Sequence, residues 1–226
     1  MPIYPNLKLI FIHIPKTGGT SILKYLNQKE KDEPLLLCND NLFTYIENDY
    51  HSVHYTYMEI LKSNIINNYN QYIFFCIIRN PYYKILSALS CHSIIDCKTS
   101  IEELKSILEI LFKNTNLNVS YLKVCKCKQL NFYNFTFNNL EYKIEIKHLL
   151  PQSDFLKNSN NEIDKSIKIL YFENLKNELI NNGLVDFDIH KNKGIMSDYD
   201  IFLTDEVKRL IYDHYQEDFV NFGYSF

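Results

Sequence analysis

The chain has 226 residues, of which 46% are hydrophobic and 23% charged, a composition that excludes a disordered protein. Its formal net charge of −3 argues against a general nucleic-acid-binding protein, which usually carries a strong basic excess. The length suits one α/β domain with a buried core, so we expect residues 1–226 to form a single domain.

The N-terminal residues show no basic segment ahead of an apolar one, and no stretch reaches the length that spans a bilayer. The sequence therefore predicts a soluble cytoplasmic protein with no membrane anchor, in which the six cysteines are reduced. Cys125 and Cys127 are the candidates for a metal site. Their spacing fits no common zinc signature and no second pair lies at ligand spacing, so we predict no metal site.

Apolar runs alternate with amphipathic segments along the chain. Strands are expected at 7–14, 35–38, 72–79 and from 167, and helices at 19–27, 56–67, 82–91, 101–112 and after 204. Residues 114–142 are rich in Asn and aromatic residues, and we expect loops and a short helix there. This order predicts an α/β fold with a P-loop-NTPase-like parallel sheet that helices flank on both faces.

The segment "PKTGGTS" lies between an expected strand and an expected helix. Glycines let backbone N–H groups approach an anion, and the positive end of a helix attracts it. The candidate phosphate ligands are Lys16, Thr17, Gly18, Gly19, Thr20 and Ser21. The lysine precedes the glycines, unlike the Walker A pattern. The alternative is a helix entry with a solvent-exposed lysine.

The segment "RNPYYKILSALS" carries a second candidate phosphate site, in which Arg79 follows the clearest strand and Ser87 lies about two turns into the next helix. Ligands of such folds bind at the carboxyl ends of the strands, so we expect Lys16 and Arg79 to meet there. A nucleotide kinase would want an Asp at this strand end to hold Mg²⁺, and its absence disfavours ordinary ATP chemistry. The alternative for Arg79 is a structural ion pair.

Taken together, "FIHIPKTGGTSI" and "RNPYYKILSA" resemble the sulfotransferase superfamily, most closely the branch with the heparan sulfate 2-O-sulfotransferases. The resemblance implies that the first motif holds the 5′-phosphosulfate of PAPS (3′-phosphoadenosine 5′-phosphosulfate) and that Arg79 and Ser87 hold its 3′-phosphate. Lys84 stands where the family often has Arg. Weaker likeness continues through "HYTYMEI", "HLLPQSDFL", "LYFENL", "HKNKG" and the last helix, but hardly through residues 94–141.

A hydroxyl acceptor needs a base, and a histidine is poised for that task. The resemblance selects His54 as the base, with His51 assisting or binding substrate. Two solvated imidazoles in a surface loop are the alternative. His13 lies inside the first strand and is expected to be a packed histidine rather than a catalytic one.

Lys16 is further expected to stabilise charge on the bridging oxygen as the sulfuryl group leaves. Lys193 and Gly194, in "KNKG", are candidates for a loop over the 3′-phosphate, with an exposed turn as the alternative. Gln152 and Ser153 are candidates for lining the donor or acceptor site.

The resemblance implies transfer of a sulfuryl group from PAPS to a carbohydrate hydroxyl without a metal. The alternatives are a nucleotide-dependent kinase or other phosphotransferase, and an inactive member that binds PAP (adenosine 3′,5′-bisphosphate) or a glycan. The expected partner is a carbohydrate or other hydroxyl acceptor, not a nucleic acid.

Overall fold

The computed structural model describes residues 2–30, 35–38, 41–44, 54–63, 66, 68–114, 132–181 and 198–226. The chain divides into two compact units, Met1–Arg79 with Gln152–Asn192 and Asn80–Pro151 with Lys193–Phe226. That residues 1–226 behave as one domain stays a prediction. No helix within the described ranges combines the length and the apolar character that a bilayer crossing requires.

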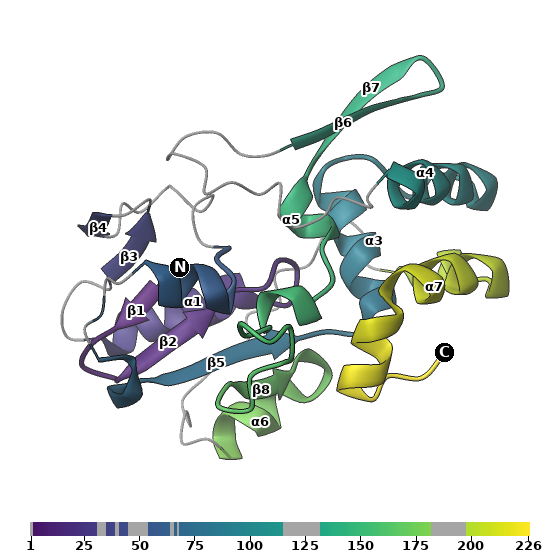
Figure 1. The fold of residues 1–226 in the computed structure, drawn as a ribbon. Helices are drawn as coiled ribbons and strands as arrows, with labels where there is room; N and C mark the ends of the chain where they lie inside the picture. Colours follow the sequence, from purple (N-terminus) through teal and green to yellow (C-terminus); the bar gives the residue numbers. More distant parts are fainter. Residues whose placement is uncertain are drawn as a thin grey trace. The chain divides into compact units, whose positions relative to one another are not determined.

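The first unit is built on a six-stranded sheet in the order β4-β3-β1-β2-β5-β8 (Figure 1). Its strands are β1 (Pro2–Tyr4), β2 (Leu9–Ile12), β3 (Leu35–Cys38), β4 (Asn41–Thr44), β5 (Ile73–Ile78) and β8 (Lys168–Tyr171). β2, β5 and β8 are parallel, whereas β1 pairs antiparallel with β2 and β3, and β3 pairs antiparallel with β4. The α/β class is confirmed, but the sheet is mixed rather than parallel throughout. The short connection from β1 to β2 permits only antiparallel pairing.

Helices cover both faces of this sheet, as predicted. The unit contains α1 (Gly19–Lys29), α2 (Tyr57–Lys62) and α6 (Leu175–Asn181), with short 3₁₀ turns η2 (Tyr69–Gln71), η4 (Ser153–Phe155) and η5 (Phe172–Asn174). Apolar residues of α1 and α6 pack in one cluster with Phe75 of β5. Phe74 points to the opposite face, because successive strand residues alternate, and Tyr57 of α2 meets it edge-on at 5.1 Å between ring centroids.

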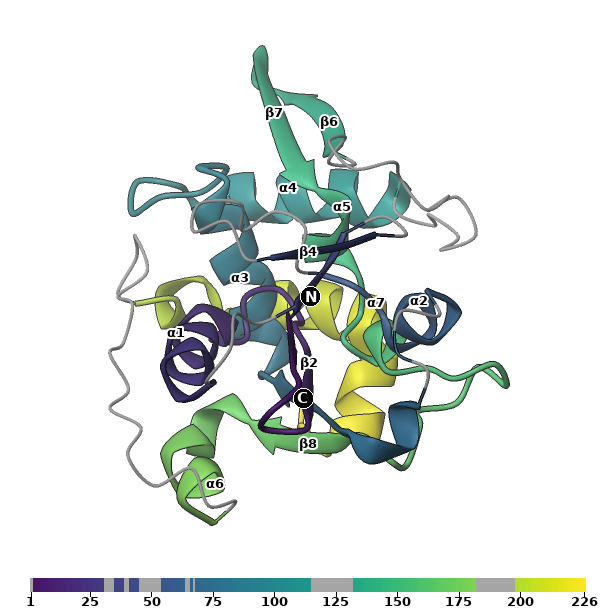
Figure 2. The ribbon, with the colours of Figure 1, turned by 90° about the vertical axis from the view of Figure 1, so that its left-hand side faces the viewer.

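The second unit combines helices with a two-stranded hairpin. Its elements are α3 (Pro81–Cys91), α4 (Ile101–Asn114), β6 (Phe132–Phe137), β7 (Leu140–Glu145), α5 (Ile146–Leu149), η6 (Asp200–Phe202) and α7 (Asp205–Phe222). The expectation of loops and a short helix at 114–142 is wrong where the structure describes it, because β6 and β7 pair there (Figure 2). Asn138 and Asn139 have φ angles of 49° and 61°, and positive φ at both central residues is what a tight hairpin turn requires.

Two buried side chains of this unit hold three successive backbone carbonyls. Lys84 of α3 donates from Nζ to the carbonyls of His148, at 3.1 Å, and Leu150, at 2.7 Å. Tyr215 of α7 donates its hydroxyl to the carbonyl of Leu149 at 2.7 Å. Burial raises the pKa of Tyr215 well above its usual value, so its hydroxyl stays a donor. The segment that ends α5 is therefore fixed from two helices.

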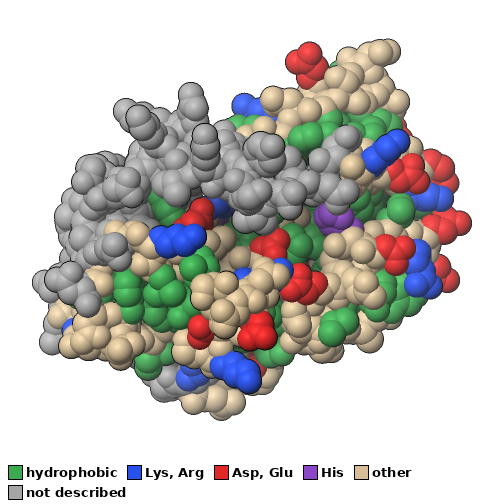
Figure 3. All heavy atoms as spheres, in the orientation of Figure 1, with side chains coloured by type: hydrophobic (Ala, Val, Ile, Leu, Met, Phe, Trp, Pro, Cys, Tyr) green, Lys and Arg blue, Asp and Glu red, His purple; other side chains and the backbone are tan. Residues whose placement is uncertain are grey.

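Charged side chains show no segregation by sign on the face drawn in Figure 3, where those of the described residues lie interspersed. This distribution agrees with the small net charge of −3. Recognition of an anion on this face therefore depends on local geometry rather than on a broad basic surface.

Candidate active site

The loop between β2 and α1 has the backbone of an anion-binding turn. Lys16 and Gly18 adopt positive φ angles of 66° and 87°, and α1 begins directly after them at Gly19. Gly18 is the N-cap residue, and no side chain caps this helix in the described part of the chain. Thr20 and Ser21 lie in the first turn of this helix. The N–H groups and positive end of an 11-residue helix can therefore serve an anion.

Neighbouring rings explain the two glycines of this loop. A Cβ atom at Gly18 would lie 2.6 Å from Cε2 of Phe172, and one at Gly19 would lie 2.0 Å from Nε2 of His13. Both separations are shorter than real Cβ contacts. The glycines are thus needed for packing within the protein.

The Thr17 hydroxyl is used inside the loop. It is fully buried and donates to the carbonyl of Ile14 at 2.9 Å, which closes the turn. Lys16, by contrast, is partly exposed. Within the motif, Thr17 shapes the loop with its hydroxyl, while Lys16 is accessible to a ligand.

Arg79 lies at the carboxyl end of β5 and meets the first motif, as predicted. Its Nη1 donates to the carbonyl of Lys16 at 3.2 Å. Its guanidinium carbon lies 4.7 Å from the centroid of the Phe172 ring, in a cation–π arrangement. The carboxyl ends of β2, β5 and β8 therefore bring Lys16, Arg79 and Phe172 to one edge of the sheet.

The side-chain amide of Gln152 brackets the backbone of Arg79. Gln152 Oε1 accepts from the Arg79 N–H at 2.8 Å, and Gln152 Nε2 donates to the Arg79 carbonyl at 2.8 Å. Gln152 is fully buried. The sequence placed Gln152 at the donor or acceptor site, and the described structure shows its amide bound to Arg79.

His54 is buried, and the backbone of His13, directly after β2, sets the orientation of its ring. Its Nδ1 lies 2.8 Å from the carbonyl oxygen of His13, and the two imidazole centroids are 4.5 Å apart. A carbonyl can only accept, so Nδ1 carries the hydrogen and Nε2 of the neutral ring carries the lone pair. His54 is therefore in the tautomer that a base acting through Nε2 requires.

His13 is a packed residue, in agreement with the sequence-based expectation. Its ring stacks on Phe11 at 5.3 Å and lies against Gly19. Burial, and then the neighbouring His54, lower the pKa of His13 well below its usual value. His13 therefore stays neutral in the folded protein.

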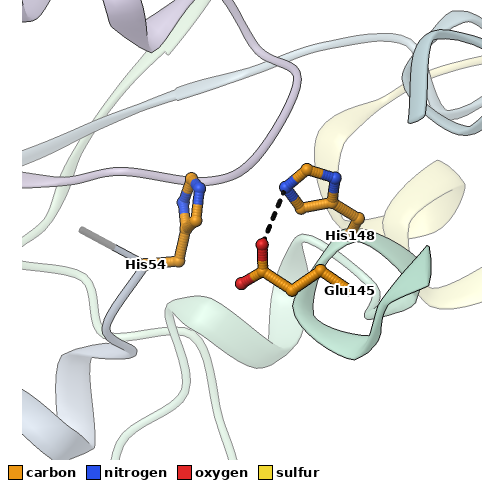
Figure 4. A group of neighbouring side chains, drawn as sticks. All are labelled: His54, Glu145 and His148. Carbon is orange, nitrogen blue, oxygen red and sulfur yellow. Dashed lines mark ion pairs between the residues drawn. The ribbon is translucent and has the colours of Figure 1, made fainter. Parts of the chain in front are cut away.

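A separate group of titratable side chains lies in the second unit. His148 and Glu145 point toward each other, with His148 Nε2 3.5 Å from a Glu145 carboxylate oxygen (Figure 4). His148 Nδ1 lies 3.0 Å from His92 Nε2. Burial raises the pKa of Glu145 to about 7, so this carboxyl is partly protonated near neutral pH. This group was not predicted from the sequence, because His92, at the end of α3, is 56 residues from His148 in the chain.

Three of the predicted site residues, His51, Lys193 and Gly194, lie outside the described residues, as do Cys125 and Cys127. Ser87 lies in the middle of α3 and is partly exposed. Its helix starts with Asn80 as the N-cap, whose side chain accepts from the N–H of Tyr82 at 3.0 Å, and with Pro81 at the first helical position.

Comparison with known proteins identifies a family. The model of the sulfotransferase family matches residues 2–225, which is nearly the whole chain. No curated protein and no solved structure matches. The chain belongs to the sulfotransferase family and is a sulfotransferase.

Proposed function

We propose that the protein transfers the sulfuryl group of PAPS to a hydroxyl of a carbohydrate, with His54 as general base. Sulfotransferases in general use PAPS as their donor. The observation that carries the proposal is the hydrogen bond of 3.2 Å from Arg79 to the carbonyl of Lys16, because it joins the two basic motifs at one sheet edge. A donor with phosphate groups at both ends of its ribose needs basic groups so joined.

The donor site would use the α1 loop and Arg79 for different groups. The loop offers Lys16 and the N-terminal end of α1, which no side chain of the described residues caps, to the 5′-phosphosulfate. The guanidinium of Arg79 suits the 3′-phosphate, since its planar fork matches phosphate oxygens. The family resemblance adds Ser87, and also Lys193 and Gly194, to the 3′-phosphate ligands.

His54 would take the proton of the acceptor hydroxyl. Its Nδ1–H is bound to the His13 carbonyl at 2.8 Å, so Nε2 is the nitrogen that carries the lone pair in the neutral ring. The backbone carbonyl also holds the ring in one orientation, and a positioned base makes a hydroxyl a better nucleophile. His51 stays a proposed assistant to this base.

Lys16 would stabilise the negative charge that develops on the bridging oxygen of PAPS, opposite the incoming hydroxyl. Its backbone is fixed in a left-handed conformation, with φ of 66°, between β2 and α1. A fixed ammonium group that meets charge only as the reaction proceeds lowers the barrier. The acceptor oxygen would bond to sulfur as the bridging S–O bond of PAPS breaks, PAP would leave, and the acceptor proton would pass to His54.

The acceptor is proposed to be a carbohydrate because the motifs resemble a branch that sulfates sugars and because an imidazole base suits a hydroxyl of high pKa. The test incubates the purified protein with PAPS and a panel of oligosaccharides and measures release of PAP. We expect release that depends on one class of sugar and is lost in Lys16→Ala and His54→Ala. Sulfation that both variants retain would refute the assignment of these residues.

A further inference from the structure

We propose that Gln152 and Phe172 are positioning residues that hold Arg79 ready for the 3′-phosphate and thereby set the preference for a donor that carries this phosphate. The inference rests on the proposed function, since it takes Arg79 as the 3′-phosphate ligand. It assigns to Gln152 and Phe172 a task that needs no contact with the donor.

Arg79 is held at its backbone by a buried amide. Gln152 accepts from the Arg79 N–H and donates to the Arg79 carbonyl, both at 2.8 Å, so that its side chain acts as a short neighbouring strand where β5 has ended. A fully buried glutamine with both amide atoms so engaged fixes the backbone from which the guanidinium extends.

The guanidinium itself is held from two further directions. One nitrogen, Nη1, is bound to the carbonyl of Lys16 at 3.2 Å, and the Phe172 ring lies 4.7 Å from the guanidinium carbon. An arginine has five N–H donors in a planar fork, and the bond from Nη1 to the Lys16 carbonyl uses one of them. The contacts remove much of the rotamer freedom that a long side chain would otherwise lose on binding.

Phe172, which contacts Arg79, also lies against the loop between β2 and α1. A Cβ atom at Gly18 would lie only 2.6 Å from Cε2, at the edge of the Phe172 ring. The same ring therefore contacts the loop at Gly18 and the guanidinium of Arg79. A shift of Phe172 would displace the candidate ligands of both ends of the donor relative to each other.

The predicted signature is a loss of selectivity rather than a general loss of binding. PAP and adenosine 5′-monophosphate differ only in the 3′-phosphate, so the ratio of their dissociation constants measures what Arg79 contributes. We expect Gln152→Ala to weaken PAP binding about tenfold while the binding of the monophosphate changes little. The KM for PAPS should rise in the same variant, while kcat changes little, because the lost interaction is made in the ground state.

The experiment is a calorimetric titration of PAP and adenosine 5′-monophosphate into the wild type, Gln152→Ala, Arg79→Ala and the double variant. Gln71→Ala is the matched control, because Gln71 is exposed in the same unit. The positioning role predicts that Gln152→Ala has no further effect on PAP binding once Arg79 is replaced. Phe172→Leu should behave like Gln152→Ala, and Phe172→Tyr, which keeps the ring, like the wild type.

Two results would overturn the inference, and they differ. If the wild type prefers PAP and Gln152→Ala keeps that preference, or if the effects of Gln152→Ala and Arg79→Ala add, the positioning role is wrong while the proposed function stands. If the wild type binds PAP and the monophosphate equally, Arg79 is not a 3′-phosphate ligand and both fall. Thermal unfolding without ligand shows whether each variant is folded, and Gln152→Glu, which keeps one acceptor oxygen, replaces Gln152→Ala if that variant does not fold.

Discussion

The ring of His54 is tied to the backbone of His13, with Nδ1 2.8 Å from the carbonyl oxygen. This contact joins the segment before α2 to the end of β2, 41 residues earlier in the chain. Because His13 lies between β2 and the loop that leads into α1, the segment that carries the proposed donor site also holds the proposed base.

Replacement of His54 should abolish turnover but spare donor binding. In His54→Asn the amide N–H can still donate to the His13 carbonyl, whereas in His54→Gln the amide extends toward the position of Nε2. Neither side chain is a base, so we expect kcat to fall about 10²–10⁴-fold in both, with PAP binding unchanged. Steady-state kinetics with calorimetry on the same preparations measures the two effects.

A His54→Asn variant with normal kcat would exclude His54 as the base and make it a structural residue. An equal loss of PAP binding and turnover would instead indicate that the ring supports the donor loop. The comparison is informative because the His13 carbonyl remains in every variant.

Gly19→Ala should destabilise the first unit, because the added methyl group would clash with the His13 ring. The added Cβ would lie 2.0 Å from His13 Nε2, so ring or helix must move, at a cost of about 1–3 kcal/mol in the free energy of unfolding. Urea denaturation measures this. The double variant His13→Ala with Gly19→Ala should recover much of the loss relative to His13→Ala alone, because the ring that obstructs the methyl group is gone.

Gly223→Ala is the control for this prediction. Gly223 has a φ of 69° but nothing within 4 Å of its Cβ position, so the variant tests backbone strain without crowding. Its cost should not depend on His13. If removal of the His13 ring rescues nothing in Gly19→Ala, the crowding account is wrong.

Replacement of Lys84 should weaken the second unit. Lys84→Met keeps the length of the stem but leaves the carbonyls of His148 and Leu150 without the Nζ donor that now lies 3.1 Å and 2.7 Å away. A buried carbonyl that loses its partner costs about 1–3 kcal/mol. We expect Lys84→Met to lower the midpoint of urea denaturation. Lys113→Met should leave the midpoint unchanged, because Lys113 is an exposed lysine of the same unit. Equal midpoints for the two variants would contradict this account.

Glu145 should make stability fall as pH rises toward neutrality. Burial raises the pKa of its carboxyl from 4.5 to about 7 in the folded protein, so the folded state binds more protons than the unfolded state between these values. Its contribution is complete below about pH 4.5 and is lost as pH rises through about 7. Glu145→Gln should remove this part of the pH dependence, which thermal unfolding measures across that range.

Glu141→Gln is the matched control, since Glu141 is exposed on the same strand, β7. It should keep the pH profile of the wild type. A Glu145→Gln profile that matches the wild type would show that the Glu145 carboxyl is not the group that titrates.

Apolar runs predicted β2 and β5 well, because a buried strand needs uninterrupted hydrophobic residues. They missed β1, which has only three residues, and with it the antiparallel half of the sheet. The β6–β7 hairpin was missed although its signal was present. The adjacent Asn138 and Asn139 lie between alternating aromatic and polar residues, and two asparagines so placed favour a tight hairpin turn.

The meeting of Lys16 and Arg79 could be predicted because both follow parallel strands. The bracket of Arg79 by Gln152 could not, since the two residues are 73 positions apart and are joined by a side chain and a backbone. The tautomer of His54 could not be predicted either. It depends on the backbone carbonyl of His13, and because every residue has a carbonyl, the sequence does not show which one the ring meets.

Calorimetric titration of the wild type with PAP, and with ATP and Mg²⁺ in parallel, shows whether the protein binds a donor of the PAPS type. We expect PAP to bind without Mg²⁺, Lys16→Ala and Arg79→Ala each to weaken this binding, and ATP with Mg²⁺ to bind far more weakly. Binding of ATP with Mg²⁺ and none of PAP would contradict the account and indicate a nucleotide-dependent phosphotransferase site.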